Sequence, residues 1–370
     1  WAKDVGNASR TSDDISPAWG RMLVNFDSAV HRALYAHPGS WNDPDMLYIG
    51  AGDFDADHPT EARTHFTLWS MLNAPLLIGA DLRSTSPALL DILGNADIIA
   101  LNQDPAGNQA TVAYDSSDLQ ILVKDLADGD KAVAIFNRGS GAQQVWLQSA
   151  HLKYSDDAPI ELTDLWTRRQ SRFTKEIPLQ VASRGTLIFR ARGTRALVDG
   201  RYLSEQPGSV NPAVDGVTRP IPDPTIFRTA AGWNGTRGAG DRPQYAGWGG
   251  ARADSTPYGQ TLQISRKVFR SGIGILANSR LEVRNAGYRR FSANVGVDDS
   301  ATDKTSTVVF AIHGDGRLLA KTRPLRWGEQ PTPLDVDVAG VTLVELVATS
   351  KGASNESLPV AWGEAALTQR

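Results

Sequence analysis

Apolar positions along the first hundred residues alternate between strand-like runs and helical spacing. The run over Val5–Thr11 predicts a strand, and Trp19, Met22 and Phe26 then recur at the spacing of one helix face. The same alternation follows twice more, with strands predicted over Ser40–Tyr48 and Ala74–Ala80 and helices over Thr60–Leu72 and Ser86–Leu93. Strands that alternate with helices predict parallel strands joined by crossover helices.

Three such units do not make a closed fold. Three parallel strands cannot close a barrel, and as an open sheet they would leave a wide apolar edge. We therefore expect either a small sheet of unusual form or a barrel whose earlier strands lie outside these 370 residues. The first residue is Trp1, with neither Met nor a signal peptide, and we expect a truncated chain.

After Asn108 the pattern changes to the period of two that strands show. The predicted strands are Thr111–Tyr114, Leu119–Lys124, Lys131–Arg138, Gln144–Leu147, Ile160–Asp164 and Thr186–Arg190. They predict an antiparallel β-sandwich over residues 109–193, after a partial barrel over 1–108. Residues 194–224, rich in Pro and Gly, are expected to form a linker and the start of a module, and 225–370 are again all-β.

Composition narrows the functional classes. The net charge of −3 indicates no nucleic-acid or anionic-membrane partner, and no apolar run is long enough to span a bilayer. The chain has no cysteine, which rules out disulfides, thiolate metal sites and a cysteine nucleophile within it. Nothing in the sequence predicts a cofactor.

Carboxylates gather where the first two predicted strands end, and active sites of parallel barrels lie at that end of the strands. The cluster consists of Arg10, Asp13, Asp14, Asp43 and Asp45, with Trp19 and Trp41 nearby. Acids transfer protons to a glycosidic oxygen and aromatic rings stack on sugars, so the cluster favours a sugar site. The structural alternative is that these acids only form turns and caps, with Asp14 capping a helix that begins at Ser16-Pro17.

Four motifs, in order and at matching spacing, resemble glycoside hydrolase family 27, the melibiase or α-galactosidase family. They are RTSDDI from Arg10, GSWNDPDML from Gly39, HFTLWSMLNAPLLIGADLR from His65 and NADIIALNQDPAG from Asn95. The resemblance implies a (β/α)₈ barrel followed by an antiparallel β-domain, with residues 1–108 holding barrel strands six to eight. It explains the open sheet inferred above.

The resemblance also implies roles for individual residues. Asp14 matches the general acid/base and Arg10 a sugar-hydroxyl-binding arginine. The remaining substrate-binding residues implied are Asp45 and Met46, with Trp41 and Asp43 in supporting positions. Asp13 stands at a position that is often Gly or Ala in the family and receives no role.

The implied reaction is release of terminal α-galactose with retention, through two carboxyl groups ~5 Å apart. The family's nucleophile follows strand four in a Lys-x-Asp pattern, which does not occur upstream of Arg10. We therefore expect these 370 residues alone to be inactive and to need the N-terminal part of their own barrel. The strand-five loop that sets sugar choice is also missing. α-N-Acetylgalactosaminidase and β-L-arabinopyranosidase activity therefore stay open, as does a non-catalytic carbohydrate-binding protein.

The C-terminal region resembles the NPCBM carbohydrate-binding module over residues of about 200–370. The motifs that carry this resemblance are GWG from Gly247, FRSGIGILANS from Phe269, FSANVGVDD from Phe291, VVFAIHGDG from Val308 and LDVDV from Leu334. The resemblance implies a jelly-roll sandwich in a secreted enzyme, which holds the enzyme near its polymer.

Several residues of this module are open to two interpretations. Leu358–Trp362 replaces the acidic motif that relatives carry, which implies a loss of sugar or calcium binding. Trp233, Trp248 and Trp327 are stacking platforms or, as we favour, core residues. Asp298-Asp299 is either a calcium site or, as we favour, a turn.

Overall fold

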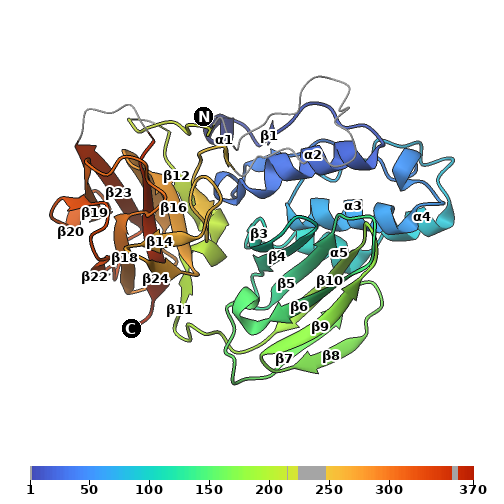
Figure 1. Cartoon of the computed structure of the whole chain (residues 1–370). Coiled ribbons are helices and arrows are strands. Elements are labelled where there is room, and N and C mark those ends of the chain that lie inside the picture. Colours follow the sequence, from blue (N-terminus) through green and yellow to red (C-terminus); the bar gives the residue numbers. More distant parts are fainter. Residues whose placement is uncertain (1, 215, 224–246, 352–356) are drawn as a thin grey trace.

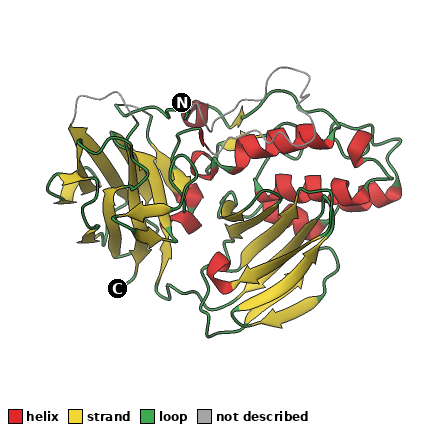
Figure 2. Ribbon diagram, in the orientation of Figure 1, coloured by secondary structure: helices red, strands yellow, loops and turns green. Residues whose placement is uncertain are grey.

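The computed structural model describes residues 2–214, 216–223, 247–351 and 357–370, and Trp233 lies outside them. The chain forms a helical N-terminal segment, a β-sandwich below it and a second β-sandwich at the C-terminal end (Figure 1 and Figure 2). No helix within the described ranges is both long and apolar enough to cross a membrane.

The N-terminal segment, residues 2–104, consists mainly of helices. Its elements are α1 (Ala2–Val5), β1 (Ala8–Arg10), α2 (Trp19–Val30), η1 (Ala33–Tyr35), β2 (Trp41–Asp43), η2 (Gly52–Phe54), α3 (Pro59–Met71), α4 (Pro87–Leu93) and α5 (Ala96–Asn102). The strands β1 and β2 pair in parallel, as consecutive strand–helix units require. The fold is therefore part of a barrel of the expected kind.

The predicted strands of this segment are longer than the observed ones. Val5–Thr11 divides into the end of α1 and the three-residue β1, and Ser40–Tyr48 keeps only Trp41–Asp43 as a named strand. The interpretation of Ala74–Ala80 as a buried strand is wrong: Leu77 and Ile78 are 64% and 41% exposed. Ile78 forms one parallel bridge, to Leu47, and a strand of this type is buried only when helices cover both faces of its sheet.

The helices pack onto the sheet of the first β-sandwich. Trp19 of α2 lies 6.0 Å from the ring of Phe136 and 6.5 Å from that of Phe54, and it is 6% exposed. Arg138 forms a buried ion pair with Asp27 of α2 at 2.8 Å. Trp19 is therefore a core residue that joins the two bodies, and not a platform for a sugar ring.

The first β-sandwich has two sheets of antiparallel strands. Its strands are β3 (Thr111–Asp115), β4 (Leu119–Asp125), β5 (Lys131–Asn137), β6 (Gln143–Gln148), β7 (Ile160–Asp164), β8 (Gln170–Phe173), β9 (Glu176–Val181) and β10 (Thr186–Arg192), with η3 (Ser149–Leu152) after β6. One sheet has the order β3-β4-β5-β10-β7-β8, and β6 pairs with β9. All six strands predicted here are present. Two strands were missed: β8 is largely exposed and has one apolar residue, whereas β9 has Ile177, Leu179 and Val181 at alternate positions, a pattern that Pro178 interrupts.

The C-terminal module is a sandwich of two antiparallel sheets. One sheet contains β13 (Arg252–Ala253), β16 (Gly272–Leu276), β24 (Pro359–Thr368), β18 (Arg290–Val297), β22 (Thr332–Asp337) and β11 (Gly200–Tyr202). The other contains β12 (Val210–Pro212), β17 (Ser279–Arg284), β23 (Leu343–Lys351), β19 (Thr307–Gly314), β20 (Arg317–Lys321) and β21 (Leu325–Arg326). The hairpin of β14 (Leu262–Ile264) and β15 (Lys267–Phe269) and the turns η4 (Leu203–Glu205) and η5 (Pro207–Ser209) complete it.

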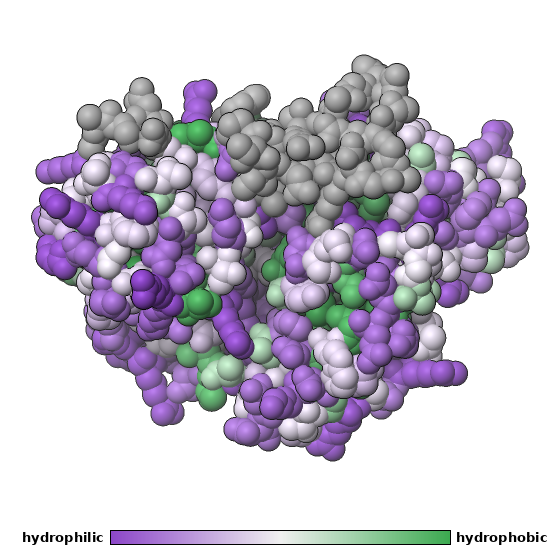
Figure 3. All heavy atoms as spheres, viewed as in Figure 1, coloured by the Kyte–Doolittle hydropathy of each residue, from purple (hydrophilic) through white to green (hydrophobic). Residues whose placement is uncertain are grey.

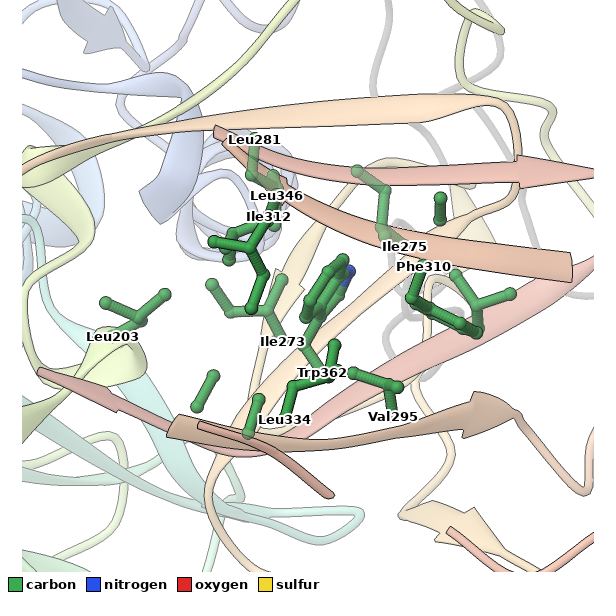
Figure 4. Packing of buried hydrophobic residues seen from close by; sticks show 14 of the residues in the cluster. Leu203, Ile273, Ile275, Leu281, Val295, Phe310, Ile312, Leu334, Leu346 and Trp362 are labelled. Atoms are coloured by element: carbon green, nitrogen blue, oxygen red, sulfur yellow. The ribbon is translucent and has the colours of Figure 1, made fainter. Parts of the chain in front are cut away.

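The core of this module lies between its two sheets. Side chains from both sheets point toward one another around Trp362, which is fully buried (Figure 4). Val360 and Ala361 of the same strand are also fully buried. The Leu358–Trp362 segment is therefore part of the core, where a run of carboxylates would lack solvent. Hydrophilic side chains cover most of the face in Figure 3, and the hydrophobic ones that show gather mainly near its centre.

Candidate functional site

The register of β1 and β2 brings the two carboxylate loops together. Arg10 pairs with Asp43, and the amide of Thr11 donates to the carbonyl of Asp43 at 3.0 Å. Because the strands are parallel, the segments that follow them leave from the same edge. The loops that carry Asp14 and Asp45 therefore start side by side.

Arg10 links the two loops through its side chain. Its Nη2 lies 3.1 Å from Oδ1 of Asp14 and 2.9 Å from Oδ2 of Asp45. The side chain of Asp45 is 9% exposed, whereas that of Asp14 is 58% exposed. The arrangement joins one fixed carboxylate and one accessible carboxylate through a single guanidinium.

Asp45 is held in place on every side. The amide of Ile15 donates to its Oδ2 at 2.7 Å and the amide of Met46 to its Oδ1 at 2.8 Å. Its own amide donates to Oδ1 of Asp43 at 2.8 Å, and Nε1 of Trp69 donates to its carbonyl at 2.6 Å. These bonds hold a φ of 82°, a conformation that costs a residue other than glycine about 1–3 kcal/mol.

Asp14 does not cap a helix. Helix α2 begins at Trp19 with Ala18 in the N-cap position, and the Trp19 amide donates to Oδ2 of Asp53 at 2.8 Å. The structural alternative for Asp14 is therefore wrong. Its carboxylate faces Arg10 and solvent, which leaves it able to exchange a proton with a bound molecule.

One face of α2 supports both loops, a role that sequence reasoning missed. Nε of Arg21 donates to the carbonyl of Asp14 at 2.7 Å. Nδ2 of Asn25, fully buried, donates to the carbonyls of Asp13 and Pro44 at 3.1 and 2.8 Å. The signal in the sequence was that Arg21 and Asn25 are polar residues four positions apart, and so share one face of the predicted helix. The structure buries that face.

The other expected residues have more peripheral positions. Met46 is half-buried, and its side chain packs against Gly79, where an added Cβ would displace it. Trp41 is half-buried at the start of β2, and its ring lies against Gly107. Asp13 is exposed and contributes only its carbonyl to the contacts described above.

A buried histidine lies beneath Asp45. The ring of His65 is 4.8 Å from that of Phe54 and 4.2 Å from that of Trp69, which donates to the carbonyl of Asp45. Burial lowers the pKa of His65 to about 3, because no charged group compensates for the lost solvent. His65 is therefore neutral at physiological pH and acts as a packing residue of the site floor.

The carboxylates of the possible calcium site bind amides of their own turn and of the β14–β15 hairpin. Asp298 accepts from the Gln263 and Ser300 amides at 2.9 Å each, and Asp299 accepts from the Ser265 and Arg266 amides at 2.8 and 2.7 Å. These carboxylates are occupied with loop amides. Across the described ranges, no three acids or histidines gather closely enough to hold a metal.

A cavity of about 360 Å³ lies between the N-terminal segment and the C-terminal module. Its wall includes Arg10 and Asn42 on one side and Trp248 and Ile275 on the other. Arg10 is the one expected site residue that lines it, so the cavity is distinct from the space in front of Asp14 and Asp45.

Three family models match successive parts of the chain. A model described as alpha galactosidase A matches residues 2–104, its C-terminal beta sandwich domain matches 116–191, and the NPCBM/NEW2 domain matches 241–368.

Curated relatives match about half of the chain. Alpha-galactosidase 2 of Arabidopsis thaliana is 38% identical over 166 residues, which cover 45% of this chain and 41% of the relative. An alpha-galactosidase of Cyamopsis tetragonoloba is 35% identical over 190 residues, which cover 51% of this chain and 46% of the relative. The chain thus spans less than half the length of each.

Among solved structures, alpha-galactosidase I from Mortierella vinacea superposes with a TM-score of 0.49 at 25% identity. The superposition covers 52% of this chain and 54% of that one.

Proposed function

Because the chain belongs to glycoside hydrolase family 27, the melibiase family, and ends in an NPCBM module, we propose that it is part of a retaining exo-α-galactosidase. The substrate is a terminal α-galactoside of an oligo- or polysaccharide. The observation that carries the proposal is the bridge from Arg10 to both Asp14 and Asp45 at the ends of adjacent parallel strands.

Asp14 is the general acid/base in this proposal. Its exposed carboxylate protonates the leaving oxygen while a carboxylate nucleophile attacks the anomeric carbon, and it then deprotonates the water that releases the sugar. Arg10 and the strained, buried Asp45 bind sugar hydroxyls, since both present fixed polar atoms at the same edge. Met46 lines the substrate site, and Trp41 and Asp43 support the residues that form this site.

The nucleophile comes from the N-terminal part of the same barrel, because no Lys-x-Asp pattern precedes Arg10. Residues 1–370 alone are expected to show no turnover of an aryl α-galactoside. The gene upstream of the Trp1 codon is expected to encode the rest of the barrel, including a strand that ends in Lys-x-Asp. Turnover by the pure 370-residue chain would contradict this assignment.

The role of Asp14 is tested in the protein that contains the whole barrel. Asp14→Ala is expected to lower kcat on a poor leaving group by at least ~10²-fold, the contribution typical of general acid–base catalysis. On an activated aryl α-galactoside, whose leaving group departs without protonation, the second step limits the variant; added azide needs no general base there, so it is expected to restore turnover and to give the α-galactosyl azide. The matched control Asp13→Ala is expected to keep activity. A β-configured azide product would identify Asp14 as the nucleophile instead.

Sugar choice within the family is a separate question. A panel of aryl α-galactoside, N-acetyl-α-galactosaminide and β-L-arabinopyranoside substrates distinguishes the three activities on the whole enzyme. We expect the highest kcat/KM on the α-galactoside.

A non-catalytic carbohydrate-binding role is the alternative, and the NPCBM match over residues 241–368 favours it. Galactoside binding without turnover by the complete gene product would support this alternative. We further propose that the protein is secreted, as its family and module suggest, and fractionation of the producing cells tests this.

A further inference from the structure

The C-terminal module shares its hydrophobic core with the N-terminal segment. Leu34 of η1 is 1% exposed and belongs to the cluster that contains Leu203, Ile273 and Trp362 (Figure 4 shows these three). Tyr35 packs against the same cluster. A core residue of the module is therefore supplied from more than 160 positions earlier in the chain.

Aromatic and polar contacts extend this interface. The ring of Tyr35 meets that of Trp248 edge-on at 4.8 Å, and the guanidinium of Arg32 lies 4.6 Å from the Trp248 ring. The Ala251 amide donates to the Tyr35 hydroxyl at 3.1 Å. Trp248 is 7% exposed, so it is a buried interface residue and not an open platform for a sugar.

Two further contacts join backbone and charged groups across the same interface. Arg252 of β13 lies 2.9 Å from Nδ1 of His31, at the end of α2, and both side chains are buried. The Gly208 amide of η5 donates to Oδ1 of Asn108 at 3.1 Å. A Cβ at Gly208 would lie 2.8 Å from the Gly107 carbonyl, so the two backbones touch at a position that only glycine allows.

A buried group of charges joins the module to the first β-sandwich. Lys131 pairs with Asp125 at 2.6 Å and with Glu205 at 2.5 Å, and Arg195 pairs with the same two carboxylates at 2.7 and 2.8 Å. These four side chains are 1–10% exposed. Beside them, Lys153 of the first β-sandwich pairs with Asp254 of the module at 2.6 Å. Buried charges of this kind tolerate little displacement, because each would lose its partner without gaining solvent.

We infer that the C-terminal module is a fixed structural partner of the barrel segment, docked on η1 and the end of α2, and not a tethered accessory. The segment over 194–212 contributes β11, η4, η5 and β12 to this docked body. Opening of the module is therefore coupled locally to the packing of Leu34, Tyr35 and the end of α2 at this interface.

Docking also reaches the loops of the candidate site. Helix α2 carries the module at its C-terminal end and, through Arg21 and Asn25, holds the carbonyls of Asp14, Asp13 and Pro44. The module thus restrains the helix that supports both loops. The catalytic meaning of this restraint rests on the proposed function, whereas the docking itself does not.

The test compares two buried leucines of the N-terminal segment in the 370-residue chain. Leu34→Ala removes a side chain from the shared core, and Leu89→Ala removes an equally buried one, 2% exposed, from the core of the N-terminal segment. Amide hydrogen exchange is followed by mass spectrometry. We expect Leu34→Ala to speed exchange in β16 and β24 of the module by at least ~10-fold, and Leu89→Ala to leave these strands unchanged.

A substitution on the module side of the interface keeps the test decisive if the Leu34→Ala variant does not fold. Trp248→Ala in the module is expected to speed exchange over residues 11–30, while Trp327→Ala, a half-buried tryptophan of the same module, does not. Unchanged exchange across the interface in both variants would show that the module folds and moves independently, and would overturn the inference. Neither measurement requires turnover, so a failure of the proposed α-galactosidase activity leaves the result interpretable.

Discussion

Asp45 and Asp14 show how two carboxylates of one cluster acquire different properties from their surroundings. Asp45 is buried, accepts two amide hydrogen bonds and keeps a φ of 82°, whereas Asp14 stays open to solvent. Fixed hydrogen-bond acceptors suit recognition of sugar hydroxyls, and an accessible carboxylate suits proton transfer. The guanidinium of Arg10 contacts both carboxylates and fixes their relative position.

The burial of His65 predicts a pH dependence of stability. The pKa of about 3 in the folded chain lies below the unfolded value of 6.5, so the unfolded state binds more protons as pH falls below 6.5. The stability that depends on neutral His65 is therefore fully present above pH 6.5 and is lost on acidification. Between pH 7 and pH 5 the wild-type chain is expected to lose about 2 kcal/mol through this residue.

Urea unfolding of the wild type and of His65→Leu at both pH values measures this loss. Other titrating groups cancel in the comparison, so the stability difference between the two chains is expected to shift by about 2 kcal/mol in favour of the variant at pH 5. An equal difference at both pH values would exclude His65 as the cause.

The sequence predicted which residues gather at the site but not how they are held. The order of strands, helices and acids placed Arg10, Asp14 and Asp45 at one edge. The positive φ of Asp45 depends in part on the amide of Ile15, a residue 30 positions away that becomes a neighbour only after folding. The burial of Trp19 depends in the same way on Phe136 from the next domain.

Helix α2 is the element that organises the candidate site. Its apolar positions predicted it well, because they recur on one face with a spacing of three or four residues. Its start could not be predicted, because the group that satisfies its first amide is Asp53, a residue of η2 that lies 34 positions further along the chain. Short strands such as β1 were overpredicted, since apolar runs extend beyond the residues that pair.

Asp53 is expected to contribute to stability as a cap supplied from outside the helix. Asp53→Ala removes the acceptor for the Trp19 amide and is expected to lower the free energy of unfolding by about 1 kcal/mol. Asp53→Asn keeps an acceptor oxygen and is expected to lose less.

Chemical denaturation at pH 7 measures both Asp53 variants, with Asp57→Ala as the control. Asp57 is exposed, and its substitution is expected to change stability by about 0.5 kcal/mol or less. Equal effects of Asp53→Ala and Asp57→Ala would show that α2 does not need this cap.

At the scale of the whole molecule, buried charges hold three folded bodies together. Composition and period-two patterning predicted two β-sandwiches and their order along the chain. Patterning could not predict their docking, because Lys131, Asp125, Glu205 and Arg195 are charged residues that are exposed in most proteins and are paired here only through the tertiary fold.

Glu205 provides a test of this charged group. Burial alone would raise its pKa, but Lys131, Lys153 and Arg195 hold the pKa below its usual value. The stability that ionised Glu205 contributes is therefore present above pH 4.5 and is lost as the pH falls below that value. Glu205→Gln is expected to lower the free energy of unfolding at pH 7 by about 3 kcal/mol, since it leaves buried cations short of a partner.

The Glu205→Gln variant and the wild type are expected to converge in stability as the pH falls below 4.5, which urea unfolding at several pH values measures. Glu61→Gln is the matched control, because Glu61 lies 3.8 Å from a half-exposed Arg184. It is expected to change stability by no more than about 0.5 kcal/mol. Similar losses in both variants would show that the buried group does not join the domains.

Under the proposed function, and for a polymer that the module binds, the shared core at Leu34 has a consequence. A module on a flexible linker samples many orientations, and linker length then sets how often a captured chain reaches the active site. A module fixed on α2 offers one orientation only. Chain ends whose spacing and direction match that geometry gain from capture, and those that do not match gain nothing. Substrate preference then becomes a property of the shape of the whole enzyme, beyond that of its sugar pocket.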